Sequence, residues 1–271
     1  MRSAKELSLD KKIIEALENL NITEKTLGVV KFFLADEEIQ VTQEFANSVS
    51  IVRLGFNDHG PVHMRTVVLN VITMLGLLQQ AGIKTSLETE GLGNLEDSIT
   101  GACLGAMLHD LGMSIGRQDH EIHSIYLAYP IIERVLLKTY PGDIQKRVMI
   151  RSIALESISG HMGNRTIHSL EAGVVQVADG CDMTKGRARI SMALSQTPRV
   201  GSIHQYSANS IEEVRLSRGK EKPIRIEVIM SSEVGLSQVE EVLLCKIASS
   251  TAKPYIELFA KVQKGKPIKY L

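Results

Sequence analysis

The chain has 271 residues, which is enough for one large domain or for one domain with a small second unit. Its 44% hydrophobic and 23% charged residues are typical of a soluble globular protein, and the 4% aromatic content predicts an aliphatic core. The 31 Lys and Arg residues balance the 31 Asp and Glu residues, so the charge gives no strong indication of nucleic-acid binding driven by phosphate neutralisation.

The cysteines and the apolar segments indicate where the protein works. Cys103, Cys181 and Cys245 are widely spaced and form no CxxC pair, which argues against a disulfide framework or a zinc ribbon and favours a reducing compartment. The N-terminus lacks the apolar stretch of a signal peptide. Polar residues and a glycine interrupt the most apolar run, 67–78, so we expect no membrane span. These features predict a cytoplasmic protein.

Helical periodicity dominates the first 195 residues. We expect packing helices over 8–20, 23–34 and 37–53, followed by a helix from Pro61 to Gly82 and a loop over 84–93. Four further helices are expected: one capped by Asn94 and ending at His109, one from His120 that Pro130 kinks or divides, one from Asp143 to Gly160, and one from about Ser169 to Asp179.

Strand patterns appear after residue 200. Segments 203–207 and 211–216 are short candidate strands, and 224–230 alternates cleanly between apolar and other residues. We expect 255–262 to pair with that strand, and a helix over 239–247, with 236 as the alternative start, to cover the buried face. The sequence thus predicts a helical domain over 1–195, a linker over 195–202 and a small α+β domain over 200–271. The edges of so small a sheet make pairing across a homodimer a further expectation.

The pair His109-Asp110 ends an apolar helix, directly before a helix-breaking glycine. An unpaired buried charge is costly, whereas neutral imidazole and carboxylate are both good ligands for divalent metals. By itself such a pair more often marks an ordinary helix end. The assignment of a metal site therefore depends on the rest of the chain.

Six of the eight histidines lie between residues 59 and 161, and several stand at the ends of apolar helices. Alternate helix ends of an antiparallel bundle lie at the same pole, where metal sites are common. The polar residues expected to converge there are His63, His109, Asp110, His120 or His123, His161 and Asp179. His123 lies one turn after His120 on the same helix face, so it is the alternative ligand.

The order of these residues, over about 55–190, resembles the HD-domain superfamily of metal-dependent phosphohydrolases. His63 in HGPVHMRTV matches the first histidine, His109-Asp110 in MLHDLG the namesake pair, and Asp179 in VVQVADGCDMTKGR the distal aspartate. His120 and His161 match the two additional histidines of members that bind two metals. The resemblance implies a mainly α fold, an HD-domain helical bundle, here followed by the small C-terminal α+β unit.

Two features differ from the cyclic-dinucleotide phosphodiesterases of this superfamily. Their HDxGK motif has a lysine where this chain has Met113, and their Gly-Tyr-Pro signature does not follow His161. These differences argue against a cyclic dinucleotide as the substrate.

The resemblance implies one or two divalent metal ions, with Mn, Fe, Mg, Zn, Co and Ni not distinguished. They would activate a water molecule for attack on the phosphorus of a small phosphorylated substrate, a nucleotide or another phosphate ester. Asp110 would bridge the metals and orient the nucleophile. Lys185 and Arg187, which follow Asp179 closely, are expected to act on the phosphate as catalytic cations.

Other polar residues have less specific interpretations. Arg117 and Arg165 lie in loops near the expected ligands and are further candidates for phosphate binding, although either is equally explained as a solvated charge. His59 is expected to cap a turn. Asp182 is expected to pair with Lys185 or with Arg187.

Two classes of function agree with these residues. The first is a metal-dependent phosphohydrolase, either a phosphomonoesterase or a phosphodiesterase. The second is a non-catalytic HD-like module that binds a nucleotide or a partner and signals through the C-terminal unit. The intact ligand set favours the enzyme, because a degenerate domain would more often have lost His109, Asp110 or Asp179.

Overall fold

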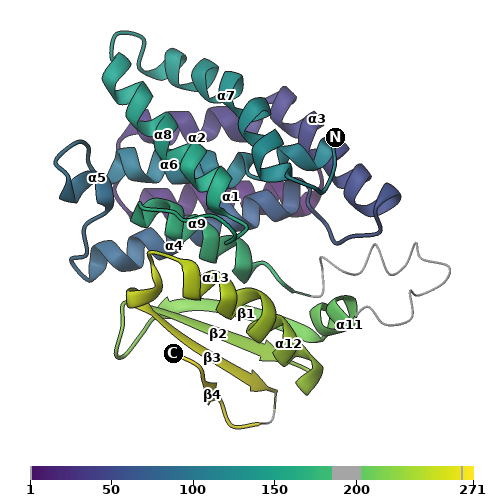
Figure 1. Ribbon diagram of the computed structural model, residues 1–271. Helices are drawn as coiled ribbons and strands as arrows, with labels where there is room; N and C mark the ends of the chain where they lie inside the picture. Colours follow the sequence, from purple (N-terminus) through teal and green to yellow (C-terminus); the bar gives the residue numbers. More distant parts are fainter. Residues whose placement is uncertain (1, 185–202, 264) are drawn as a thin grey trace.

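The protein is mainly helical and carries a small sheet in its C-terminal part, as the sequence predicts. The computed structural model describes residues 2–184, 203–263 and 265–271. The expected linker and the expected domain boundary near 195 lie outside these residues, as do Lys185 and Arg187. Figure 1 shows the helices of the first part on one side of the molecule and the sheet on the other.

The helical part begins with α1 (Ala4–Asn19), α2 (Glu24–Ala35) and α3 (Glu37–Ser48), and a π-helical turn (Val49–Arg53) extends α3. It continues with α4 (Pro61–Gln80), α5 (Ser86–Thr89), α6 (Leu95–Leu108), a 3-10 turn (Leu111–Ser114), α7 (His120–Thr139), α8 (Ile144–Gly160) and α9 (Leu170–Cys181). The expected helices are confirmed within a few residues at their ends. The predicted loop over 84–93 is wrong in part, because a capping box at Thr85 starts the short helix α5.

Side-chain caps begin the helices that lead to the polar cluster. Asn94 forms a capping box at the start of α6, and the carboxylate of Asp143 accepts from the backbone at the start of α8. Ser169 caps α9 in the same way. Pro130 does not divide α7, which is one helix from His120 to Thr139. The starts of these helices are thus determined by local sequence.

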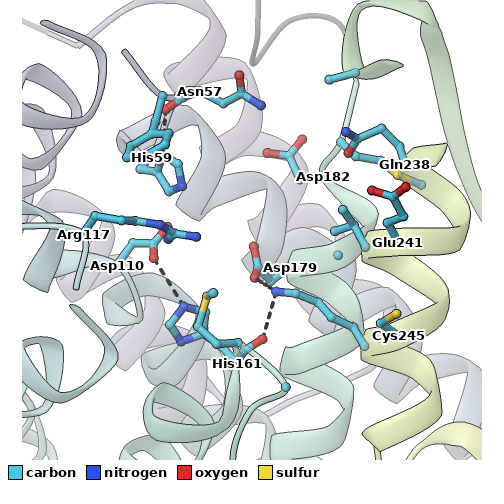
Figure 2. Close-up of a pocket in the computed structure, with 18 of the residues that line it drawn as sticks. Asn57, His59, Asp110, Arg117, His161, Asp179, Asp182, Gln238, Glu241 and Cys245 are labelled. Carbon is cyan, nitrogen blue, oxygen red and sulfur yellow. Dashed lines mark hydrogen bonds and ion pairs between the residues drawn. The ribbon is translucent and has the colours of Figure 1, made fainter. Parts of the chain in front are cut away.

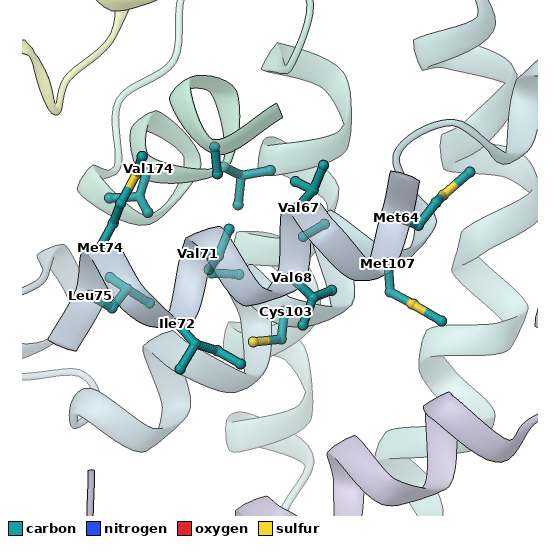
Figure 3. Packing of buried hydrophobic residues seen from close by; sticks show 14 of the residues in the cluster. Met64, Val67, Val68, Val71, Ile72, Met74, Leu75, Cys103, Met107 and Val174 are labelled. Carbon is teal, nitrogen blue, oxygen red and sulfur yellow. The ribbon is translucent and has the colours of Figure 1, made fainter. Parts of the chain in front are cut away.

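Helix α4 is the central helix of the core. Its Val68, Val71 and Leu75 are buried, and the helix packs against α1, α6 and α9, with Cys103 and Met107 of α6 beside it (Figure 3). Among the described residues it is also the one helix long and apolar enough to cross a membrane by length and composition, although the interrupted run led us to expect none. Because 67% of its most apolar window is buried inside the protein, α4 is packed as a core helix.

The C-terminal unit starts with α11 (Ile203–Ser210), so the strand expected over 203–207 is wrong. The sheet has the order β1-β2-β3-β4, with β1 (Ile211–Arg218), β2 (Ile224–Met230), β3 (Ile256–Val262) and β4 (Ile268–Lys269). Its central pair β2–β3 is parallel and its outer pairs are antiparallel. A parallel pair needs a long crossover. The crossover here contains a 3-10 turn (Glu233–Gly235), α12 (Leu236–Gln238), a π-helical turn (Val239–Leu243), α13 (Leu244–Ser249) and a 3-10 turn (Lys253–Tyr255).

The crossover segment docks the C-terminal unit onto α9. Ser250 Oγ donates to the carbonyl of Gly173 at 2.9 Å, and Gln176 Nε2 donates to Ser249 Oγ at 2.8 Å. A side chain at Gly173 would meet the backbone nitrogen of Ala252 at 2.9 Å, so the glycine is needed for this close approach. Helices α9 and α13 are therefore held side by side (Figure 1).

Candidate metal centre

Four histidines and two aspartates from five helical segments meet in the interior of the protein. His63 lies in the first turn of α4 and His120 begins α7, whereas His109 and His161 directly follow the last residues of α6 and α8. Asp110 comes next to His109, and Asp179 belongs to the last turn of α9. The exposed fraction of none of the six exceeds 7%. The structure thus brings together the residues that the sequence placed at helix ends.

The six residues form two groups that share Asp110. Its Oδ2 lies 3.4 Å from His63 Nε2 and 3.3 Å from His109 Nε2. Its Oδ1 lies 3.1 Å from His120 Nε2 and 3.4 Å from His161 Nε2. Asp179 Oδ1 completes the first group, at 3.2 Å from His63 Nε2 and 3.7 Å from His109 Nε2. Each group gathers at least three potential metal ligands, and His109, His161 and Asp179 form a further combination that crosses the two groups.

The partners of the imidazoles indicate that each Nδ1 carries a proton. Each Nδ1 lies beside an oxygen that can only accept: Asp182 Oδ2 for His63 (2.7 Å), Ala106 O for His109 (2.8 Å), Arg117 O for His120 (3.0 Å) and Ile158 O for His161 (2.7 Å). A neutral imidazole that donates from Nδ1 has a lone pair on Nε2.

The Nε2 atoms nevertheless face one another, at 3.2 Å between His63 and His109 and at 3.1 Å between His120 and His161. Two lone pairs at such a distance repel each other unless a proton or a metal ion lies between or beside them. The donor set of imidazole nitrogens and carboxylate oxygens therefore fits divalent transition metals, with Asp110 able to serve both groups.

The pKa values agree with a centre that attracts positive charge. Burial alone lowers the pKa of His109, but the carboxylates of Asp110 and Asp179 outweigh it and raise that pKa to about 9. Burial alone would raise the pKa of Asp110, but the neighbouring imidazoles of His109 and His59 hold it well below its usual range. For His161, burial is the largest cause and lowers the pKa to about 4. A proton on His109 thus occupies part of the place that a metal ion would take.

A cavity of about 530 Å³ opens above the cluster, between the helical part and the crossover helix (Figure 2). Asp110, His161 and Asp179 line its base, and Arg117 lies at one side beside His59. The opposite wall comes from the C-terminal unit, whose lining residues are Ala208, Gln238, Glu241, Val242, Cys245 and Lys246.

Lys246 is a site residue that the sequence reasoning missed. Its ammonium group donates to Asp179 Oδ2 and, at 2.9 Å, to the carbonyl oxygen of His161. The burial of Asp179 favours a raised pKa, but the charge of Lys246, with the nearby His109 and His63, holds that pKa well below its usual range. No motif surrounds Lys246, and 67 residues separate it from Asp179, so no local signal indicates its position.

The remaining candidates lie in different places. His120 joins the cluster, whereas His123 belongs to none of the ligand groups found among the described residues. The Nδ1 atom of His123 is buried and has no hydrogen-bond partner among the described residues. His59 makes turn contacts from its Nδ1, at 2.9 Å to Ser50 Oγ and 2.6 Å to Asn57 O.

Two further charged residues near the site have partners among the described residues. Arg165 lies 3.8 Å from Glu121, and 47% of its side chain is exposed. Asp182 accepts from His63 and so supports a potential ligand, whereas the lysine and arginine expected to pair with it lie outside the described residues.

The fold and the cluster define a mainly helical protein with a buried His and Asp site that could bind metal and is compatible with an HD-type site. Comparison with known proteins assigns the family. The chain belongs to the family of the uncharacterized protein MJ1020 of Methanocaldococcus jannaschii, to which it is 41% identical over 235 residues, or 87% of this chain and 88% of that protein.

A more distant similarity covers part of another protein. Ribonuclease Y of Clostridium tetani is 28% identical over 175 residues, which are 60% of this chain and 31% of that protein. No family model matches the chain, and no solved structure matches it.

Proposed function

We propose that the protein is a metal-dependent phosphohydrolase that acts on a nucleotide or another phosphate ester. The observation that carries the proposal is the convergence of four imidazole Nε2 atoms and two carboxylates on a buried centre beside a cavity. When bound there, divalent ions would neutralise phosphate oxygens and activate a water nucleophile.

The residues of the chain have separate roles in this proposal. His63, His109 and Asp179 would hold one ion, and His120 and His161 a second, with Asp110 shared between them. The backbone carbonyls that accept from Nδ1 orient the rings, which keeps the ligand nitrogens directed at the centre.

Arg117 would provide a cation for the phosphate at one side of the cavity. Its guanidinium lies 5.7 Å from the centre of the Phe56 ring. Such a contact limits the freedom of the side chain and leaves its N–H groups able to bind phosphate oxygens.

The similarity to a protein named a ribonuclease supports a phosphodiester bond as one substrate to test. The zero net charge does not favour a long polyanion. A short oligonucleotide and a mononucleotide are therefore both included below.

The test is a hydrolysis panel with the purified, Mn²⁺-loaded protein, using p-nitrophenyl phosphate, bis(p-nitrophenyl) phosphate, nucleoside monophosphates, cyclic mononucleotides and a short RNA. We expect turnover of at least one substrate. Asp110→Ala and His161→Ala should lower kcat/KM at least ~100-fold, because each removes a metal ligand. His168→Ala is the matched control, since His168 is exposed and outside the cluster.

Full activity and full metal content in Asp110→Ala would contradict the proposal. Nucleotide binding by the metal-loaded protein without any turnover would instead support the second hypothesis, a non-catalytic binding module.

A further inference from the structure

The C-terminal unit contributes a charged side chain directly to the candidate metal centre. Lys246 of α13 is only 12% exposed at its side chain, and its ammonium group is bonded to Asp179 and to the backbone at His161. Both partners belong to the cluster, one as a side chain and one through its carbonyl oxygen. Figure 2 shows these two interactions at the base of the cavity.

The two oxygens of Asp179 point to different partners. Oδ1 faces the imidazoles of His63 and His109, at 3.2 and 3.7 Å, whereas Oδ2 accepts from Lys246. Lys246 therefore neutralises the carboxylate without occupying the oxygen that faces a metal position. An ion pair at this place is compatible with a bound metal.

The ammonium group has a donor to spare. A lysine carries three N–H donors and no acceptor, and among the described residues two donors go to Asp179 and to His161. The side chain also lines the cavity, so a ligand in the cavity can reach the ammonium group.

Gly180 allows Lys246 to approach the centre closely, because a Cβ atom there would lie 3.1 Å from Lys246 Cδ. A Cβ atom at Gly163 would be in ordinary contact with the same stem, at 3.9 Å from Lys246 Cγ. The backbone of α9 and the turn after His161 thus pass directly along the lysine stem. Gln238, Glu241 and Cys245 lie on the same side of the crossover helix and also face the cavity (Figure 2).

We propose that Lys246 is a phosphate-binding residue of the site, so that the C-terminal unit completes the substrate pocket of the helical part. The inference rests on the proposed function and names a residue that the ligand set does not include. The ligand class is a phosphate group whose non-ester oxygen accepts from the ammonium group. Lys246 and Arg117 are the lysine and arginine that line the cavity among the described residues, and they come from its two opposite walls.

Electrostatics favours a contact between Lys246 and a bound phosphate. A metal ion held by Asp179 would partly neutralise the carboxylate and so weaken the attraction between Asp179 and the ammonium group of Lys246. A phosphate adds a new negative charge, and its oxygens form strong charge-assisted hydrogen bonds with an ammonium group. Lys246 would then hold Asp179 and the phosphate together.

The test measures the binding of inorganic phosphate to the full-length, metal-loaded protein by isothermal titration calorimetry, which needs no turnover. Lys246→Met removes the charge and keeps most of the stem, Lys246→Arg retains the charge, and Lys253→Met is a matched control on an exposed lysine of the same unit. We expect Lys246→Met to weaken the phosphate Kd about 10-fold or more at unchanged metal stoichiometry, because a hydrogen bond to a charged group is lost. Lys246→Arg should retain most of the affinity, and Lys253→Met should equal the wild type.

An unchanged phosphate Kd in Lys246→Met would overturn the inference and leave Lys246 as a structural ion pair. The same conclusion follows if the variant changes only the metal affinity, or if the metal-loaded wild type binds no phosphate. Failure of the proposed function is a separate result, since it appears as a lack of turnover in a wild-type protein that still binds phosphate through Lys246.

Discussion

Asp182 offers a quantitative test of the metal centre, because it supports a ligand without facing a metal position. Its Oδ2 accepts from His63 Nδ1 at 2.7 Å, and both side chains are buried. Carboxylates that orient a metal-binding histidine typically contribute about 10–100-fold to metal affinity. Asp182→Ala should therefore weaken the metal group of His63 and His109 by ~1.4–2.7 kcal/mol. Asp182→Asn should have a smaller effect, since its amide oxygen still accepts from Nδ1.

The assay is a competition titration of the metal-free protein with Mn²⁺ or Zn²⁺ against a fluorescent chelator. Only one of two binding steps should weaken in Asp182→Ala. Glu121→Gln is the comparison at the second group, where the carboxylate lies 3.5 Å from His120 Nδ1 but the backbone carbonyl at 3.0 Å remains. We expect less than a threefold change there. Unchanged affinity in Asp182→Ala, or an equal loss in both steps, would refute the reasoning.

Three further predictions concern the ligands and the docking of the C-terminal unit. His120→Ala should lose one of two bound metals and His123→Ala neither, as measured by metal analysis of the purified variants; loss of metal only in His123→Ala would contradict the assignment. Burial lowers the pKa of His109, but neighbouring carboxylates raise it to about 9, so its imidazole is protonated in the metal-free protein at neutral pH and must release that proton to bind a metal. Metal affinity should then rise with pH up to about 9, and about one proton should be released on binding. Calorimetry in buffers of different ionisation enthalpy measures this proton release. A metal affinity that does not change with pH over this range would contradict the prediction. Gly173→Ala should lower the free energy of unfolding by ~1–3 kcal/mol, because the added methyl group meets the backbone of the docked unit. Gly28→Ala, on an exposed face of α2, should raise the free energy of unfolding by ~0.5–1 kcal/mol. Thermal unfolding checks both variants, and equal effects would count against the docked arrangement.

The sequence by itself determined the helices and the residues at their ends. Capping residues such as Asn94 and Ser169 act on backbone groups a few residues away, so local sequence is enough to specify where a helix begins. The apolar periodicity specifies which face is buried. For the same reason His109 and Asp179 could be placed at the ends of buried helices before any contact was known. The alternating pattern of 224–230 likewise predicted β2 and its pairing with β3.

Only the tertiary structure decided which side chains meet. His120 and His123 lie on one helix face and are equivalent in the sequence, but packing directs the first into the cluster. Segment 203–207 was predicted as a strand and is helical, because a short polar segment has too little periodicity to determine its own conformation. No sequence pattern identified Lys246 as a residue of the site. Its role depends on a crossover helix docking onto α9 through close glycine contacts, and such contacts between segments distant in the chain follow from packing rather than from local sequence.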